Sequence, residues 1–285
     1  MTDTPSLRKV VTGDDSITCF HDETGELYHN RAGAYTEALQ NYIQPSQIKS
    51  LVSKQPIYVL DVCFGLGYNT FVLLEELRKL NMPCTINVLG LDIDESILAI
   101  LDEVLKDKRL AYLRQFMTSE VFQSKFGIYN FSLDKDKTIN VQLEIRQQDI
   151  RQAATRLKED FDLIYHDGFS PYKVPELWTV DLFKRYYELL KKKDGALLTY
   201  SAAPAVRAGL RQAGFHVFAT TAVGTKHGGT LALTSADDKR QAKPLTVEQE
   251  ERLKTRSGIP YRDNESLNST RQDVLLLRKK EQDAF

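Results

Sequence analysis

The chain has 285 residues, 42% of them hydrophobic, which is enough for one large domain with short appendages. Its 38 Lys and Arg residues nearly balance its 39 Asp and Glu residues, so a nucleic-acid partner would have to meet a local basic patch. Three cysteines without CxxC spacing indicate buried thiols in a reducing compartment, and no metal site is predicted. A polar start and the lack of a roughly 20-residue apolar run favour a cytosolic protein outside the membrane.

The first 56 residues are expected to form a front segment, with a strand at Ser16–Phe20, a turn at Gly25 and a helix at Gly33–Tyr42. From residue 57 onward, strand and helix patterns alternate. The expected strands are 57–62, 86–92, 139–147, 161–166, 195–201, 215–222 and 229–234. The expected helices are about 69–80, 95–106, 150–158, 176–192 and 204–213.

Strands separated by helices of this length predict βαβ units and a mostly parallel sheet. The last two strands are joined through Gly224–Gly229, a gap that permits only an antiparallel hairpin. We therefore predict an α/β fold over 57–235, with a mostly parallel seven-stranded sheet and an antiparallel edge hairpin, as in Rossmann-like class I methyltransferases. An aromatic-rich insertion at 108–138 is interpreted as a helical flap or, alternatively, an ordinary packed helix. A charged helical tail is expected at 236–285.

A glycine turn follows the first of the alternating strands. Gly65 and Gly67 lack a Cβ, so the chain can turn sharply there and a ligand can approach the backbone closely. Thr70 stands where a dinucleotide site would place its third glycine, and no GK[ST] follows, which excludes a P-loop. The remaining ligand of this class is S-adenosyl-L-methionine, whose positive amino group and sulfonium suit an acid such as Asp61.

Acidic residues also follow the next two strands. Asp92 ends the second strand, where a carboxylate can accept both hydroxyls of a ribose, and Asp94 is ranked behind it. Asp149 follows the third strand, where it can accept the adenine amino group or cap the next helix. Each acid alone is explained by a cap or a turn, but three acids at successive strand ends indicate a ligand site.

The fourth strand ends in the sequence Asp167-Gly168-Phe169. Asp167 is expected at the tip of that strand, next to where the methyl group would lie. The nearby rings of Phe169, Tyr172 and Trp178 offer flat faces for a sulfonium or a base, with core packing as the alternative. His166 lies on the strand itself, so a buried, hydrogen-bonded role is favoured over catalysis.

The run from Asp167 to Thr179 resembles the D-G-F-x-P-x-x-N-P-x-x-W signature of the MnmC-like family, the methyltransferase half of the bifunctional tRNA 5-methylaminomethyl-2-thiouridine biosynthesis enzyme. The run at 206–215 resembles the same half, and the front segment and the run at 256–263 resemble a stand-alone version of it, so that the resemblance covers about 16–278. Three positions depart from the family pattern. Cys63 replaces a usual glycine, Asp61 stands where glutamate is frequent, and Val174 replaces a usual asparagine.

The resemblance implies transfer of a methyl group from S-adenosyl-L-methionine to the primary amine of 5-aminomethyl-(2-thio)uridine at the tRNA wobble position. The main role of Asp167 would be to orient that amine, and its secondary role would be to accept the amine proton. Without the flavin-dependent oxidase half, the chain is expected to accept only the free aminomethyl nucleoside, which separate tRNA-modifying enzymes would supply. The partner is therefore the anticodon loop of tRNA, with no membrane partner and an oligomeric state left open.

The predicted cofactor residues are His29, Glu37, Asp61, Phe64, Gly65, Gly67, Asn69, Asp92, Ile93, Asp149, Ile150, Asp167, Gly168 and Phe169. In the front segment, the choice among Tyr28, His29, Asn30 and Glu37 stays open. The predicted substrate residues are Phe169, Pro171, Lys173, Trp178, Arg207 and Lys226. Further basic candidates for tRNA contact, each alternatively a solvated face, are Lys184, Arg185, Lys191–Lys193, Arg211 and His227.

Two other functions remain as alternatives. The same scaffold can serve a methyltransferase that acts on a small molecule or a protein, because a fold does not fix the substrate. The chain can also be a non-catalytic S-adenosyl-L-methionine-binding protein, although Asp167 and the aromatic loop argue against it. A dehydrogenase is disfavoured by Thr70 and by the lack of a second domain.

Overall fold

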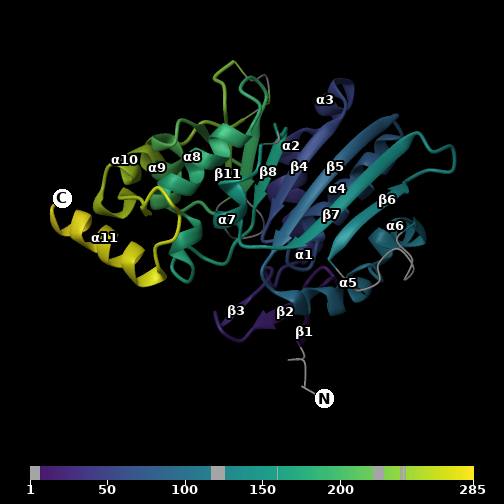
Figure 1. Cartoon of the computed structure of the whole chain (residues 1–285), viewed down its shortest axis with the longest axis horizontal. Coiled ribbons are helices and arrows are strands. Elements are labelled where there is room, and N and C mark those ends of the chain that lie inside the picture. The colour runs from purple at the N-terminus through teal and green to yellow at the C-terminus, as the bar shows by residue number, and fades with distance from the viewer. Residues whose placement is uncertain (1–6, 117–125, 159, 221–227, 238–239, 241) are drawn as a thin grey trace. The chain divides into compact units, whose positions relative to one another are not determined.

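A computed structural model describes residues 7–116, 126–158, 160–220, 228–237, 240 and 242–285. The chain divides into two compact units, unit 1 (residues 1–149) and unit 2 (residues 150–285), and Figure 1 follows them along the chain by colour. No helix within the described ranges is both long and apolar enough to cross a bilayer.

Unit 1 is built on four strands in the order β4 (Ile57–Val62), β5 (Cys84–Asp92), β7 (Ile139–Gln147) and β6 (Gly127–Ser132). The first three are parallel, and β6 pairs with β7 in the antiparallel sense. Five of the six β4 side chains are buried, as expected for a parallel strand covered on both faces. Because β4, β5 and β7 run in the same direction, their carboxyl ends meet at one edge.

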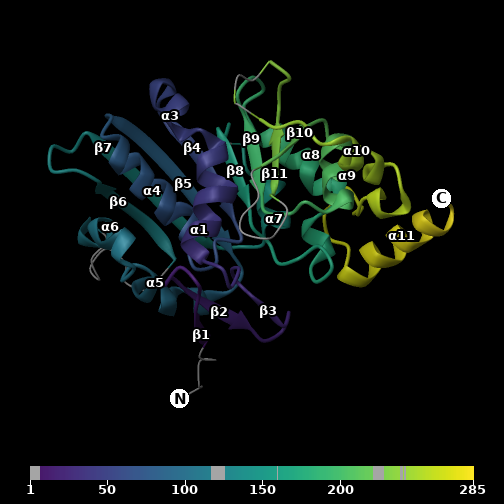
Figure 2. The ribbon, with the colours of Figure 1, turned by 180° about the vertical axis from the view of Figure 1, so that it is seen from behind.

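Helices cover this sheet, and Figure 2 shows α1 and α4 on the same face of it. The longer helices of unit 1 are α4 (Tyr68–Leu80), α5 (Leu98–Val104) and α6 (Ala111–Phe116). The front segment adds α1 (Ala34–Ala38), a π-helical turn (Leu39–Ile43), α2 (Gln44–Ser46) and α3 (Ile48–Leu51). Short 3-10 turns lie at Val52–Lys54, Glu95–Ile97 and Lys108–Leu110.

A second, small antiparallel sheet precedes these helices. It consists of β1 (Arg8–Val11), β2 (Ile17–His21) and β3 (Glu26–Leu27). Figure 1 shows this sheet close to α5. The hydrogen bond from Tyr28 to Asp94 ties the residue after β3 to the residues after β5. The small sheet therefore lies next to the carboxyl edge of the large one.

Unit 2 contains the strands β8 (Leu163–His166), β9 (Ala196–Thr199), β11 (Thr230–Leu233) and β10 (His216–Ala219), in that order. β8 and β9 are parallel, whereas β11 runs antiparallel to both of its neighbours. The helices are α7 (Ile150–Ala154), α8 (Val180–Leu189), α9 (Pro204–Gln212), α10 (Val247–Leu253) and α11 (Arg271–Asp283), with 3-10 turns at Pro175–Leu177 and Arg256–Gly258.

Local sequence explains where the unit 2 helices start. Thr179 caps α8 by accepting the N–H of Leu182, and α11 begins with a reciprocal capping box between Thr270 and Asp273. The face of α8 that carries Phe183 and Tyr186 is buried, which gives the helix its amphipathic pattern.

The predicted α/β class and its Rossmann-like arrangement are confirmed, and the seven expected strands are β4, β5 and β7–β11. The insertion differs from the predicted helical flap. It contains α6, but residues 127–132 form an eighth strand, β6, because Ile128, Tyr129 and Phe131 suit an edge strand that pairs along β7. Residues 242–246 of the expected helical tail are not helical, and α10 begins only at Val247.

Candidate active site

The glycine turn of unit 1 is a left-handed backbone loop between β4 and α4. Cys63, Gly65 and Gly67 have φ angles of 59°, 53° and 75°. A Cβ on Gly67 would lie 2.7 Å from the Phe71 ring, so glycine is required there for packing as well as for conformation. The N–H of Phe64 donates to the carbonyl of Leu91 on β5, which fixes the start of the loop against the sheet.

Asp61 is fully buried near the end of β4, one residue before the strand stops. The hydroxyl of Thr70, in the first turn of α4, donates to Asp61 Oδ2 at 2.6 Å. Thr70 occupies the position of the third glycine of a dinucleotide motif, and its side chain is hydrogen-bonded to Asp61 of β4. This pair explains why the turn departs from that motif.

Asp92 ends β5 and holds the glycine loop through its carboxylate. Oδ2 accepts the backbone N–H of Gly65 at 2.8 Å, and Oδ1 accepts the N–H of Asp94 at 2.9 Å. Burial raises the pKa of Asp92 to about 6, although these N–H groups lower it. The backbone N–H of Ile93 is a third such donor, and an ionised carboxylate has about four acceptor positions, so acceptor capacity remains for a ligand hydroxyl.

Tyr28 lies over the same loop and is the contact in the front segment that the sequence left undecided. Its hydroxyl donates to Asp94 Oδ2 at 2.7 Å, and its ring would lie 3.2 Å from a Cβ on Gly65. Burial would raise the pKa of Asp94, but hydrogen bonds from Ser96 and Tyr28 outweigh it and lower that pKa. Asp94 thus stays ionised and fixes Tyr28 above the loop.

His29 and Glu37, both predicted as cofactor residues, make structural contacts. His29 is buried, with its ring 5.0 Å from the Tyr68 ring, and burial lowers its pKa to about 4, so it is neutral at pH 7. Glu37 accepts the backbone N–H of Asn30 at 2.7 Å. Among the front-segment candidates, the geometry therefore favours Tyr28 over these two.

The other predicted cofactor residues of unit 1 lie in the loop itself, in the first turn of α4, and directly after β5 and β7. The Phe64 ring packs where a Cβ on Gly90 would lie, at 2.5 Å, so Gly90 is a residue of this site that the sequence analysis missed. Asn69 is buried in the first turn of α4. Ile93 is 70% exposed directly after Asp92, which leaves an apolar surface beside a buried acid. Asp149 is half-buried two residues after β7.

In unit 2, the loop that begins at Asp167 is held by two side-chain donors. Asp167 is half-buried immediately after β8. The indole Nε1 of Trp178 donates to the carbonyl of Phe169 at 2.9 Å, and the hydroxyl of Tyr200 donates to the carbonyl of Gly168 at 3.0 Å. Ile150, the remaining predicted cofactor residue, is buried at the start of α7.

Trp178 does not present its ring to a substrate. Its exposed fraction is 0%, and it packs edge-on against His166 with ring centroids 4.5 Å apart. The core alternative therefore holds for Trp178, while Phe169 is half-buried. His166 has the structural role expected of it: it is fully buried, its Nδ1 lies 3.2 Å from the Tyr186 hydroxyl, and burial lowers its pKa to about 3.

Arg207 is also corrected as a substrate residue. It is 2% exposed, and its guanidinium donates to the Thr230 hydroxyl and the Gly229 carbonyl, both at 3.0 Å. A buried arginine bound to the chain itself cannot reach a phosphate. Pro171 and Lys173 are half-buried in the loop after Asp167, and Lys226 lies outside the described residues, as does His227.

Most of the other basic candidates make contacts within unit 2. Arg211 forms a bidentate pair with Glu250, and Lys191 binds both oxygens of Asp162. Partners within unit 2 are also present for Lys184, Arg185 and Lys192. Lys193 is exposed.

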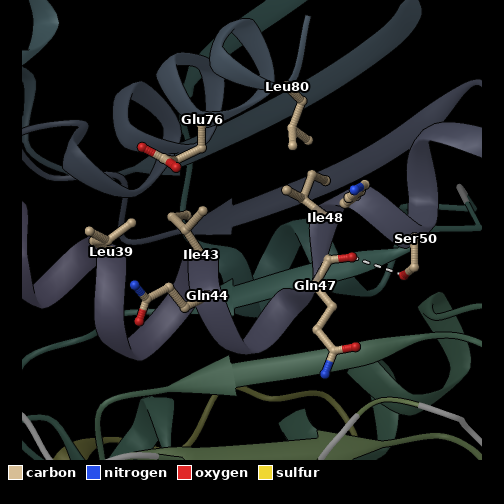
Figure 3. A pocket seen from close by; sticks show the side chains of 9 residues that line it. Leu39, Ile43, Gln44, Gln47, Ile48, Ser50, Glu76 and Leu80 are labelled. Carbon is tan, nitrogen blue, oxygen red and sulfur yellow. Dashed lines mark hydrogen bonds between the residues drawn. The ribbon is translucent and has the colours of Figure 1, made fainter. Parts of the chain in front are cut away.

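A hollow of about 630 Å³ lies elsewhere in unit 1, between the front-segment helices and α4 (Figure 3). Figure 3 shows Ile48 and Leu80 pointing toward each other across it. Its lining residues are Leu39, Ile43, Gln44, Gln47, Ile48, Lys49, Ser50, Glu76 and Leu80. None of them is a predicted site residue, so the hollow is separate from the glycine loop.

Comparisons with known proteins agree with a methyltransferase fold. Residues 108–235 match the model of a family described as S-adenosyl-L-methionine-dependent methyltransferase. An uncharacterised protein of Methanocaldococcus jannaschii is 30% identical over 93% of this chain and 70% of its own length. The crystal structure of MnmC2 from Aquifex aeolicus superposes with a TM-score of 0.77, at 26% identity, over 100% of this chain and 87% of that one.

Bifunctional proteins are also similar. The tRNA 5-methylaminomethyl-2-thiouridine biosynthesis bifunctional protein MnmC of Ralstonia nicotianae is 26% identical over 75% of this chain. The match covers 33% of that relative, so the chain spans about a third of the length of the bifunctional protein.

Proposed function

The chain belongs to the MnmC-like family of S-adenosyl-L-methionine-dependent methyltransferases, and from this premise we propose that it methylates the primary amine of 5-aminomethyl-(2-thio)uridine at the wobble position of tRNA. The observation that carries the proposal is the Asp167-Gly168-Phe169 loop, which follows β8 and is fixed by Trp178 and Tyr200. The names of the bifunctional relatives support the choice of tRNA as substrate.

The residues of unit 1 fit S-adenosyl-L-methionine. The left-handed loop at Gly65 and Gly67 leaves the backbone open to close approach. Asp92 is a buried acid whose remaining acceptor positions suit ribose hydroxyls, and the exposed Ile93 side chain offers an apolar surface for adenine. When bound, this cofactor supplies an electrophilic methyl group on a sulfonium.

Asp167 is proposed to orient the amine. A primary alkylamine in water has a pKa of about 10, so it attacks only after losing a proton, and an apolar enclosure lowers that pKa. A carboxylate with an ordinary pKa near 4 is a weak base for such an amine. Asp167 therefore accepts an N–H and aims the nitrogen lone pair first, and takes up the proton second. Correct placement of the two reactants supplies most of the acceleration.

The distribution of charge supports a polyanionic substrate for unit 2. Residues 1–149 carry 15 Lys and Arg against 21 Asp and Glu, a net charge of −6. Residues 150–285 carry 23 Lys and Arg against 18 Asp and Glu, a net charge of +5. The half that contains Asp167 is thus the basic half, although the whole chain has a net charge of −1.

Nucleoside mass spectrometry tests the reaction. The chain is incubated with S-adenosyl-L-methionine and tRNA that carries the aminomethyl uridine, and conversion to the methylaminomethyl nucleoside is expected. A panel of small amines and peptides is assayed in parallel. Methylation of a panel member with untouched tRNA would replace the proposal by a small-molecule or protein methyltransferase.

Replacing Asp167 by alanine tests its role. We expect Asp167→Ala to bind S-adenosyl-L-methionine as tightly as wild type and to lose at least about a hundredfold in single-turnover rate, because the amine is no longer aimed. The matched control is Asp237→Ala, an exposed aspartate of the same unit, which should keep full activity. A single-turnover rate in Asp167→Ala equal to that of wild type would refute the assignment.

A further inference from the structure

We propose that Tyr200 is a positioning residue for methyl transfer, which holds the carbonyl of Gly168 and thereby fixes Asp167. The role in catalysis rests on the proposed function, whereas the role in holding the loop does not. Tyr200 belongs to no motif in the sequence and comes from outside the loop, directly after β9. Its part in the site became visible only from its hydrogen bond to Gly168.

The strand register brings Tyr200 to the loop. β8 and β9 are parallel, with Tyr165 opposite Leu198. Asp167 and Tyr200 each follow that pair by two residues, so both leave the sheet at the same edge. From there the Tyr200 hydroxyl donates to the Gly168 carbonyl at 3.0 Å.

Two consecutive carbonyls of the loop are held in this way. Tyr200 takes the carbonyl of Gly168, and Trp178 takes the carbonyl of Phe169 at 2.9 Å. The two rings also contact each other edge-on, with centroids 5.9 Å apart. Trp178 belongs to the loop segment itself and packs on His166 of β8, whereas Tyr200 links the loop to the end of β9.

This arrangement has a consequence for Asp167. The residue lies between the end of β8 and the first held carbonyl, so its backbone is fixed on both sides. The carbonyls of Gly168 and Phe169 are thereby turned toward Tyr200 and Trp178, which sets the course of the backbone directly after Asp167. Loss of the Tyr200 hydroxyl frees one carbonyl and loosens the backbone next to Asp167.

The variant Tyr200→Phe removes the donor and keeps the ring. We expect kcat to fall by about tenfold or more with an unchanged KM for S-adenosyl-L-methionine, because the misplacement affects the amine and not the cofactor. The matched control is Tyr187→Phe. The Tyr187 hydroxyl also donates to a backbone carbonyl, that of Thr234 at 3.3 Å, and its ring packs on Phe215, away from the loop. This control should keep wild-type kcat.

A second measurement needs no substrate. Trp178 is the only tryptophan of the chain and is fully buried, so its fluorescence reports on this loop and should be poorly quenched by acrylamide in wild type. We expect Tyr200→Phe to raise the quenching constant and Tyr187→Phe to leave it unchanged. Equal quenching in wild type and Tyr200→Phe would overturn the inference, as would an equal kcat. A wild-type chain that leaves the tRNA unmethylated would instead overturn the proposed function.

Discussion

Cys63 shows how a departure from a family pattern is tolerated. The MnmC-like pattern has glycine at this position, and the backbone here adopts a φ of 59°, the left-handed conformation that favours glycine. A non-glycine residue in this conformation costs about 1–2 kcal/mol. Cysteine has no branch at Cβ and is half-buried, so it fits the loop without a clash that would close it. The turn thus adopts the left-handed conformation with cysteine at this position.

The pKa of Asp92 leads to a prediction for cofactor binding. Because burial raises this pKa to about 6, the side chain is mostly protonated at pH 5 and mostly ionised at pH 7. The ionised form accepts the N–H groups of Gly65 and Asp94 and still accepts ligand hydroxyls, whereas the proton of the neutral form occupies one acceptor position. Affinity for S-adenosyl-L-methionine is thus expected to fall by up to about tenfold per pH unit below pH 6.

Isothermal titration calorimetry between about pH 5 and pH 7.5 measures how the affinity for S-adenosyl-L-methionine depends on pH. Asp92→Asn is the comparison variant, because its amide does not titrate; its affinity should be lower at pH 7 and nearly constant over the range. Parallel pH profiles in wild type and Asp92→Asn would contradict the prediction.

At the scale of single residues, sequence spacing located the acids but not the contacts of long side chains. Asp61 and Asp92 were identified because a strand end is a position that hydrophobic pattern alone can mark. Trp178 and Arg207 were assigned to the substrate, but both are buried. An aromatic or arginine side chain near a loop can point to solvent or to the interior, and tertiary packing decides between them.

At the scale of elements, the alternation of strands and helices was predictable because buried parallel strands are continuous apolar runs. The edge strand β6 was not, since an edge strand alternates weakly and its aromatic residues also fit an amphipathic helix. The small β1–β3 sheet was foreseen only as one strand and a turn. Its contact with the residues after β5 is made by the side chain of Tyr28, whose partner Asp94 is 66 residues away in the sequence.

The contact between the small sheet and the glycine loop leads to a prediction for Tyr28→Phe. The variant keeps the ring above Gly65 and removes the hydrogen bond to the Asp94 carboxylate. Such a bond to a charged group contributes roughly 1.5 to 3 kcal/mol. If part of it serves to hold the loop in its binding conformation, the dissociation constant for S-adenosyl-L-methionine should rise by about five- to thirtyfold.

The control for this variant is Tyr112→Phe in α6, which loses a hydroxyl from a ring that stacks under the Arg78 guanidinium at 4.3 Å. Equilibrium binding of the cofactor is measured for both variants. An unchanged dissociation constant in Tyr28→Phe would show that the hydrogen bond to Asp94 does not support the loop.

At the scale of the whole molecule, the near-neutral net charge hides a division between the two units. The sequence total of −1 argued only for a local basic patch, whereas the boundary at residue 149 separates a net −6 from a net +5. That boundary follows from tertiary contacts, which composition does not contain. Arg211 and Lys191 are paired within unit 2, so the excess charge that faces a polyanion has to come from other basic side chains, such as Lys173 and Lys193.

This division predicts a steep salt dependence for tRNA binding. Each phosphate neutralised by a Lys or Arg side chain releases counterions, and for a protein with about four such contacts the slope of log K against log salt is about −3 to −4. The slope is measured by filter binding or fluorescence anisotropy between about 50 and 200 mM salt.

Charge reversal at an exposed position of unit 2, Lys193→Glu, should weaken tRNA binding at low salt and make the slope of log K against log salt less steep. S-adenosyl-homocysteine has no phosphate group and serves as the control ligand. Its affinity should change little with salt concentration. A flat response for tRNA would mean that the positive charge of unit 2 does not contact the phosphate backbone.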